Sequence, residues 1–115
     1  MEFFVICIDR ANTAEERACA RLAHLEYVHL HRSKFLFGGP LLSDVEEERV
    51  GMVCMIDMPT REAAERFIAQ EPYTQAGIVE TVIIKRIKKV IPEDDPAYLD
   101  NLLTNERRRC ESGNR

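Results

Sequence analysis

The sequence lacks long apolar runs, an excess of positive charge and closely spaced cysteines. No apolar run reaches the roughly 18–20 residues that a membrane-spanning helix needs, so we expect no membrane partner. The net charge of −4 and the isoelectric point near 5.4 argue against binding to nucleic acid, which normally needs a basic surface. The first residues, Met1–Phe4, lack the basic region of a signal peptide and are expected to begin a strand.

The cysteines lie far apart in the sequence, at positions 7, 19, 54 and 110. Disulfide frameworks and zinc sites need cysteines at short, paired spacings, so neither is predicted. Reduced thiols in a cytoplasmic protein fit this pattern, with Cys7 and Cys54 as small buried apolar residues. The sequence also has no glycine-rich phosphate loop, nucleophile elbow or dinucleotide fingerprint, and we expect no cofactor.

What is present fits one small domain, because the 115 residues are 45% hydrophobic and 31% charged. Short apolar, β-branched segments alternate with two segments of helical pattern. The predicted elements are a strand at 3–8, a helix at 14–33, strands at 35–37 and 50–58, a helix at 61–71 and a strand at 79–87. This βαββαβ order predicts an α+β, ferredoxin-like fold with an antiparallel sheet and both helices on one face.

Short signals predict where these elements begin and end. Thr13 and Glu16 form a capping-box pattern at the start of the first helix. Thr60 is expected to cap the second helix and Pro72 to end it, while Gly38-Gly39-Pro40 is expected to close the second strand. The second helix carries an apolar stripe at helical spacing, formed by Ala64, Phe67 and Ile68.

The first and third predicted strands are apolar on both faces. An antiparallel sheet with one wet face should alternate apolar and polar residues. In the first strand both alternating sets are apolar, namely Phe3, Val5 and Cys7 against Phe4, Ile6 and Ile8. Two helices can cover only one face. A homodimer is the simplest cover for the other, because an isologous contact buries the same face twice; the alternative is that the C-terminal tail covers it.

Residues 92–115 are predicted to form a helical C-terminal extension beyond a domain of residues 1–91. Glu93-Asp94-Asp95-Pro96 is typical of an acidic helix start, and Arg107-Arg108-Arg109 of a helix end. The apolar stripe between them consists of Tyr98, Leu99, Leu102 and Leu103. We therefore expect a packed helix from about Pro96 to Arg109, docked on its own subunit, a partner subunit or another protein.

The first predicted helix carries polar side chains on one face. At 100° per residue, Arg17, His24 and His31 fall within about 40° of one another. Ala18, Leu22 and Leu25 point elsewhere and are expected in the core. An imidazole titrates near neutral pH and can move a proton at a substrate when a carboxylate or carbonyl fixes its tautomer. His24 is therefore a candidate acid/base residue.

No metal site is predicted from the histidines. One helix cannot bring His24, His29 and His31 to the same ion, and no Asp or Glu lies at ligand spacing on their face.

Three stretches, at 21–27 (RLAHLEY), 37–41 (FGGPL) and 71–77 (EPYTQAG), together resemble the YCII-related family of small α+β proteins, from Phe3 to about Val90. The resemblance implies a dimeric α/β barrel, in which two sheets close face to face. It also implies a site that pairs the histidine of the first stretch with an aspartate of an Asp-Pro-Tyr turn. By this resemblance His24 is the acid/base residue and Glu71 the carboxylate that orients it.

The sequence departs from the family pattern at Glu71, where the family usually has aspartate, and at Leu22, where it often has proline. The added methylene moves the carboxylate, and misplacements of about 1 Å can cost on the order of a hundredfold in rate. The departure predicts either a reshaped pocket or a weakened pair.

Two functions of different class follow. The first is a small cofactor-independent enzyme, a lyase or isomerase that binds a small aromatic or enol-containing molecule and moves a proton with His24. The second is a non-catalytic module that binds a small ligand or recruits a protein through its tail. A His–carboxylate pair at a closed apolar pocket favours the enzyme, whereas an open or filled pocket favours the module. The catalytic candidates are His24 and Glu71, and the substrate-binding candidates are Gly39, Pro40, Tyr73, Arg17 and His31.

Several of these residues also have a purely structural explanation. His24 could be a solvated or packed helix residue, and Glu71 could only hydrogen-bond nearby amides of its turn. Tyr73 could be packing, and a tight strand end would by itself explain the glycines at 38 and 39.

Overall fold

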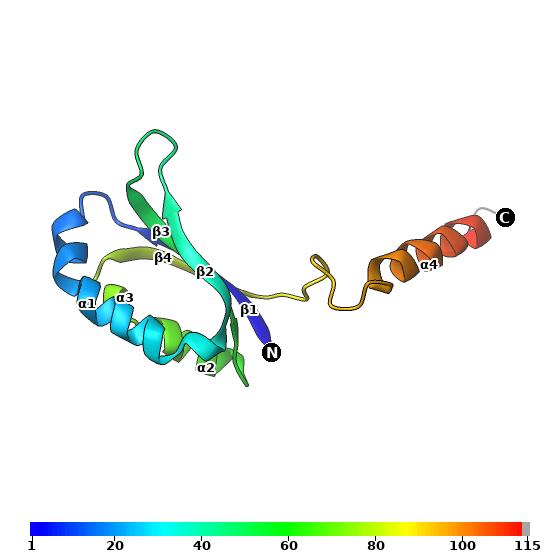
Figure 1. Ribbon diagram of the computed structural model, residues 1–115, viewed down its shortest axis with the longest axis horizontal. Helices are drawn as coiled ribbons and strands as arrows, with labels where there is room; N and C mark the ends of the chain where they lie inside the picture. Colours follow the sequence, from blue (N-terminus) through cyan, green and yellow to red (C-terminus); the bar gives the residue numbers. More distant parts are fainter. Residues whose placement is uncertain (114–115) are drawn as a thin grey trace.

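The protein, seen here in a computed structural model that describes residues 1–113, has the predicted βαββαβ order followed by a long C-terminal helix (Figure 1). The sheet is antiparallel with strand order β2-β3-β1-β4, which is the ferredoxin-like arrangement. Its elements are β1 (Glu2–Asp9), α1 (Ala14–Leu30), a 3₁₀ turn (Arg32–Lys34), β2 (Phe35–Leu42), β3 (Arg49–Asp57), α2 (Arg61–Ala69), α3 (Pro72–Gln75), β4 (Val79–Arg86) and α4 (Tyr98–Gly113). The predicted fold class is confirmed.

The helices α1, α2 and α3 lie on one side of the sheet, and the core lies between them (Figure 1). Alternate residues of β1 and β3 point toward the helices and meet the apolar stripe of α2, as predicted. These buried residues are Phe3, Val5 and Cys7 of β1, Met52, Cys54 and Ile56 of β3, and Ala64, Phe67 and Ile68 of α2. Burying them supplies the hydrophobic free energy that holds the helices on this inner face.

The opposite face of the sheet, called here the outer face, is apolar and uncovered within one chain. Ile6 lies at its centre, paired with Val53 on one side and Ile83 on the other. Ile8, Phe37 and Ile83 are 38%, 46% and 41% exposed. The register places these apolar side chains on the outer face: Phe4, Ile6, Ile8, Phe37, Leu41, Val53, Met55 and Ile83.

The strand β2 is longer than predicted, because Gly38-Gly39-Pro40 does not close it. Gly38 pairs with Cys54, Gly39 with Val53 and Pro40 with Met52, and the strand continues to Leu42. A proline is tolerated here because β2 is an edge strand, where a missing amide donor on the open side costs no ladder bond.

Two predictions about helix ends are wrong and one is confirmed. Thr60 caps α2 by accepting a hydrogen bond from the Ala63 amide at 3.1 Å, as predicted. Thr13 makes no capping-box bond, because its hydroxyl instead donates to the Arg10 carbonyl at 2.8 Å and accepts from Arg17 at 2.7 Å. Pro72 does not end α2 but begins α3, where the first helical position needs no amide donor.

The orientation of α1 is the reverse of the expected one. Ala18, Leu22 and Leu25, expected in the core, are all exposed, Leu22 at 70% and Leu25 at 46%, and His24 is the one buried residue of this helix. The face of α1 that turns inward carries His24, which lines a cavity against the sheet, and Tyr27, which packs against the apolar core.

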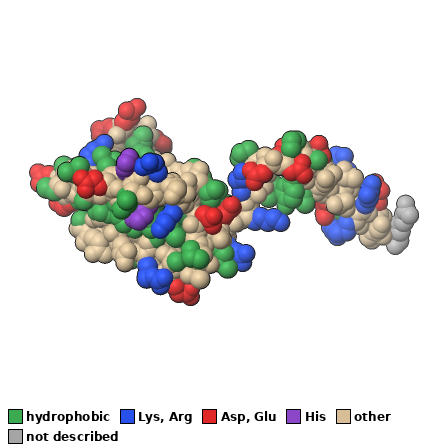
Figure 2. Space-filling model, turned by 60° about the horizontal axis from the view of Figure 1, so that its bottom comes forward, with side chains coloured by type: hydrophobic (Ala, Val, Ile, Leu, Met, Phe, Trp, Pro, Cys, Tyr) green, Lys and Arg blue, Asp and Glu red, His purple; other side chains and the backbone are tan. Residues whose placement is uncertain are grey.

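The C-terminal helix forms as predicted but does not pack on its own domain. It runs from Tyr98 to Gly113, none of its residues is buried, and it stands apart from the sheet and its helices (Figure 1). Apolar side chains remain on its surface (Figure 2), among them Leu99, Leu102 and Leu103. The tail therefore leaves the outer face of the sheet uncovered. In the described part of the chain, no helix is long and apolar enough to cross a membrane.

Candidate active site

The imidazole of His24 is held between α1 and the start of α3. His24 lies near the middle of α1 and is only 7% exposed. Its ring stacks on Tyr73, with ring centroids 4.0 Å apart and planes 9° from parallel. Two aromatic faces in contact fix the plane of the imidazole, so its two nitrogens point in defined directions.

The carboxylate of Glu71 meets His24 and also caps α3. Glu71 is the residue before Pro72, and proline disfavours the helical conformation of its predecessor, so Glu71 stays extended as the N-cap. Its Oε2 accepts hydrogen bonds from the amides of Tyr73 at 3.1 Å and Thr74 at 3.3 Å. Its Oε1 is hydrogen-bonded to His24 Nδ1. Both oxygens are therefore engaged, and the longer side chain still reaches the histidine.

This contact decides which nitrogen of His24 is available for chemistry. A carboxylate can only accept a hydrogen bond, so Nδ1 carries the proton. In the neutral ring Nε2 then holds the lone pair. Within residues 1–113, Nε2 has no hydrogen-bond partner, yet it is not among the fully buried unpaired atoms, so it keeps some access. His24 thus presents a base with a fixed tautomer.

A second charged group lies beside this pair. Asp9, at the end of β1, is buried, and its Oδ2 accepts from Arg17 Nη1 at 3.5 Å and from Arg49 Nε at 3.3 Å. The Arg49 guanidinium lies over the Tyr73 ring, 4.5 Å from its centroid. Arg49 and His24 therefore both contact Tyr73, from the first residue of β3 and from α1.

A cavity of about 260 Å³ opens at His24, between α1 and the inner face of β2 and β3. We call it the His24 cavity. It is lined by His24, Leu25, Val28, Arg32, Phe35, Gly38, Gly39, Pro40, Arg49, Met52 and Cys54. Gly38 keeps the floor open, because a β-carbon there would come within 3.2 Å of the Cys54 β-carbon.

The structure brings some of the predicted site residues together and separates others. His24, Gly39 and Pro40 line the cavity, while Glu71 lies behind His24 and Tyr73 against its ring. Arg17 lies outside the cavity in its contacts with Asp9 and Thr13. His31 also lies outside it, packed at the end of α1 against Tyr27 and Phe67.

Sequence reasoning missed Arg49 and Asp9. Arg49 lies just before the strand predicted at 50–58, although in the structure it is the first residue of β3. The available signal was a carboxylate directly after an apolar strand, at a point where a buried acid needs a cationic partner.

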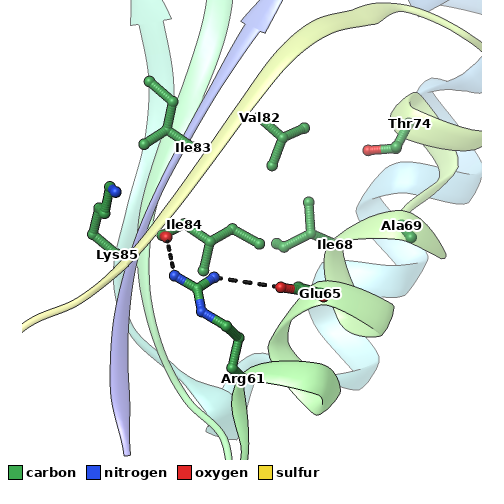
Figure 3. Close-up of a pocket in the computed structure, with 9 residues that line it drawn as sticks. All are labelled: Arg61, Glu65, Ile68, Ala69, Thr74, Val82, Ile83, Ile84 and Lys85. Atoms are coloured by element: carbon green, nitrogen blue, oxygen red, sulfur yellow. Dashed lines mark hydrogen bonds and ion pairs between the residues drawn. The ribbon is translucent and has the colours of Figure 1, made fainter.

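A larger groove lies at the edge of the sheet, between β4 and the helices α2 and α3 (Figure 3). Its volume is about 710 Å³, and its floor is formed by apolar residues such as Ile68, Val82 and Ile84. The charged pair at its rim is already engaged, since Arg61 donates to the Ile84 carbonyl at 2.7 Å and contacts Glu65 at 3.4 Å. No histidine or cysteine is among the residues that line this groove.

No metal centre is found in the described part of the chain, where no three His, Cys, Asp or Glu side chains are grouped to hold an ion.

The two buried thiols are expected to be inert. Burial raises the pKa of the Cys7 thiol to about 11 and that of Cys54 to about 12. At pH 8, roughly one molecule in a thousand or fewer would carry either thiolate, the form that reacts. Cys19 and Cys110 are exposed. We predict two fast-reacting thiols with Ellman's reagent in the native protein and four in denaturant.

The raised pKa values of Cys7 and Cys54 also predict how the stability of the fold changes with pH. The folded protein keeps these two protons above about pH 9, where an unfolded chain loses them, so this contribution to stability falls as pH rises toward 12. Rapid native modification of Cys54, mapped by mass spectrometry, would contradict the assignment.

Fold and site together define a small α+β protein of ferredoxin-like topology with a buried His–carboxylate pair at a cavity between helix and sheet. The sequence pattern of the YCII-related domain family matches residues 1–88, and the chain belongs to this family. The helix α4 lies outside the matched residues.

Named relatives agree with this assignment. The chain is 28% identical to protein YciI of Escherichia coli, over 78% of this chain and 99% of that protein. It is 29% identical, at the same coverage, to an uncharacterized protein of Haemophilus influenzae.

Solved structures share the fold. The 5-chloro-2-hydroxyhydroquinone dehydrochlorinase TftG of Burkholderia phenoliruptrix, solved with 2,5-dihydroxybenzoquinone, superimposes with a TM-score of 0.75 at 24% identity. That match covers 82% of this chain and all of TftG. A muconolactone isomerase superimposes with a TM-score of 0.55 at 11% identity, covering 83% of this chain and 96% of the other. These likenesses show the fold.

Proposed function

We propose that this protein is a cofactor-independent enzyme that moves a proton on a small cyclic substrate, as a lyase or an isomerase. The observation that carries the proposal is the contact of His24 Nδ1 with Glu71, which leaves Nε2 free as a base on a residue that lines an apolar cavity. A general base needs a fixed tautomer and a position within reach of the substrate, and the contact with Glu71 and the adjoining cavity support these two requirements.

The chemistry follows from the two nitrogens of one ring. Nε2 takes a proton from a carbon next to a carbonyl group, which leaves an enolate in the cavity and an imidazolium on His24. The Glu71 carboxylate, hydrogen-bonded to Nδ1, stabilises that positive charge. In an isomerisation the proton returns to a different carbon. In an elimination the electron pair of the enolate instead expels a substituent from the neighbouring carbon.

The size of the cavity supports a small substrate. Its volume of about 260 Å³ lies just below the roughly 300–1,000 Å³ of pockets that take drug-sized ligands. A molecule with one ring fits this space. Proteins of the same fold include a dehydrochlorinase and an isomerase, which is an analogy of fold.

We further infer that the working form is a homodimer in which the outer faces of two sheets pack together. The outer face carries apolar side chains on all four strands, with Thr81 and Lys85 beside Ile83 on β4, and neither the three helices of the domain nor α4 covers it. Leaving such a face in water would forfeit hydrophobic free energy that a second copy recovers. Obligate interfaces of this kind typically bury more than about 2,000 Å² in total.

The proposed reaction can be tested before the natural substrate is known. Single-ring compounds with an enolisable carbonyl group, including muconolactone and 2,5-dihydroxybenzoquinone, would be incubated with the protein in D₂O. Incorporation of deuterium would be followed by NMR. We expect exchange with the wild type and a loss of about 10²–10⁴-fold in His24→Gln, the usual contribution of a general base.

The matched control is His29→Gln, which changes an exposed histidine of the same helix and should keep the wild-type rate. Compounds that raise the melting temperature of the wild type without exchanging deuterium would favour the non-catalytic binding module. Equal exchange by wild type and His24→Gln would refute the role of His24.

A further inference from the structure

We propose that the ligand of the His24 cavity is an organic anion, a ring that carries a carboxylate or an ionised enol, and that Arg49 binds its charged group. This inference deepens the proposed function, on which it rests for the assignment of the cavity as a substrate site.

The charged lining of the cavity has one sign. Arg32 and Arg49 line it, and no Asp or Glu is among the lining residues. Apart from His24, the other lining residues are apolar or glycine. Arg32 is exposed and bonded to the His29 carbonyl at 2.9 Å, so it lies at the rim. Arg49 has a side chain only 17% exposed, which places a largely desolvated cation inside.

The Arg49 guanidinium is held in place by two contacts and still has hydrogen-bond donors available. Nε donates to Asp9 at 3.3 Å, and the plane of the group lies over Tyr73. Within residues 1–113, neither Nη nitrogen of Arg49 donates a hydrogen bond to another protein group. The two Nη groups of an arginine match the two oxygens of a carboxylate, so the free end of this group is suited to bind one.

The neighbouring carboxylate does not neutralise the site. Asp9 is shared between Arg17 and Arg49, and Arg17 also lies 3.9 Å from Glu48, so Arg49 has only a share of one buried carboxylate. A second hollow, of about 290 Å³, adjoins Arg49 and is also lined by Arg17 and Arg21. Arg21 has no ion-pair partner in the described part of the chain. Both hollows are lined by arginines and by no Asp or Glu, and a cleft lined by charges of one sign concentrates ligands of the other.

The position of Arg49 also fits the proposed chemistry. Tyr73 stacks on His24 and carries the Arg49 guanidinium, so one ring sets the positions of both groups. An anion held by Arg49 would bring the attached ring into the cavity beside His24. When His24 removes a proton, the same cation faces the negative charge that develops on the substrate, and such charges are stabilised best by donors already in place.

The test compares single-ring carboxylates with their uncharged amides, for example benzoate with benzamide and 2-furoate with 2-furamide. Binding would be measured by calorimetry and by thermal shift, on wild type, Arg49→Lys and Arg49→Gln. We expect carboxylates to bind the wild type in preference to amides. Arg49→Gln should weaken carboxylate binding roughly 10–100-fold and leave the amides unchanged, the range of a charge-assisted hydrogen-bond pair. Arg49→Lys keeps the positive charge but lacks the paired Nη donors, so its affinity for carboxylates should lie between those of the wild type and Arg49→Gln.

The control is Arg66→Gln, which removes the same charge from the exposed surface of α2 and should bind carboxylates as the wild type does. Melting curves would verify that Arg49→Gln is folded. Equal binding of carboxylates and amides, no carboxylate binding at millimolar concentration, or equal loss of both ligands in Arg49→Gln would overturn the proposal.

Because the readout is binding, failure here is separable from failure of the proposed reaction. Carboxylate binding that depends on Arg49, without deuterium exchange that depends on His24, would leave an anion-binding site without catalysis. Deuterium exchange that depends on His24, without carboxylate binding that depends on Arg49, would support the catalytic role of His24 and refute the anionic ligand.

Discussion

Replacing Ile6 with lysine is expected to abolish the homodimer and to give insoluble or unfolded protein. Ile6 lies at the centre of the outer face, between Val53 and Ile83, whereas Val5 points into the core of its own chain. In the proposed dimer the ammonium group would be buried among apolar side chains with no partner. An unpaired buried charge costs several kcal/mol, a large part of the stability of a small domain.

Glu26→Lys is the matched control, since it places a lysine on the exposed surface of α1, on the other side of the sheet. It should leave the dimer intact. Sedimentation velocity at micromolar concentration would report the mass of both variants and of the wild type. A folded wild-type monomer, or an Ile6→Lys variant with unchanged mass and melting temperature, would remove the dimer from consideration.

Glu71→Gln is expected to abolish proton transfer and to destabilise the fold by about 1–3 kcal/mol, the cost of one unsatisfied buried hydrogen-bonding group. Glu71 offers acceptor oxygens on both sides, to His24 Nδ1 and to the amides of Tyr73 and Thr74. Glutamine has one acceptor and one donor. Either its NH₂ group faces the backbone amides, or it faces Nδ1 and forces the proton onto Nε2. In the first case the negative charge that stabilises the imidazolium is lost, and in the second His24 no longer has a lone pair on Nε2 to act as a base.

Glu71→Asp is the conservative comparison, because it keeps two acceptor oxygens and restores the carboxylate that the family usually has. It should retain exchange activity, or raise it, under conditions where Glu71→Gln has lost it. Deuterium exchange gives the rates, chemical denaturation gives the free energies of unfolding, and ¹⁵N chemical shifts of the imidazole report its tautomer. Wild-type exchange in Glu71→Gln would mean that the carboxylate caps α3 and does nothing more.

The rate of deuterium exchange separates a catalytic pair from a structural one. If Glu71 only caps α3, its substitution would lower stability and leave the rate unchanged. The proposed role requires the rate to fall in Glu71→Gln, through loss of the charge or a change of tautomer, which a stability measurement alone would not reveal.

The sequence by itself determined the order and type of the four strands and of the helices α1, α2 and α4, because each rests on local signals; α3 and the 3₁₀ turn were not predicted. Alternating β-branched residues, the Thr60 cap and the apolar stripe of α2 act within a few residues of one another, and all appear in the structure. Because β1 and β3 are apolar on both faces, the sequence also predicted an apolar outer face of the sheet. His24 and Glu71 could be singled out through the family resemblance, since their spacing along the chain is part of its pattern.

Only the tertiary structure decided which face of α1 points inward and which groups surround His24. Leu22 and Leu25 are exposed and His24 is buried, because α1 closes the His24 cavity. The core beneath the helix is already filled by side chains of α2. Arg49 meets Asp9 across 40 residues, and Glu71 meets His24 across 47. Contacts at such separations depend on how the sheet aligns its strands and helices, so periodicity and capping signals, which act within one or two turns, cannot specify them.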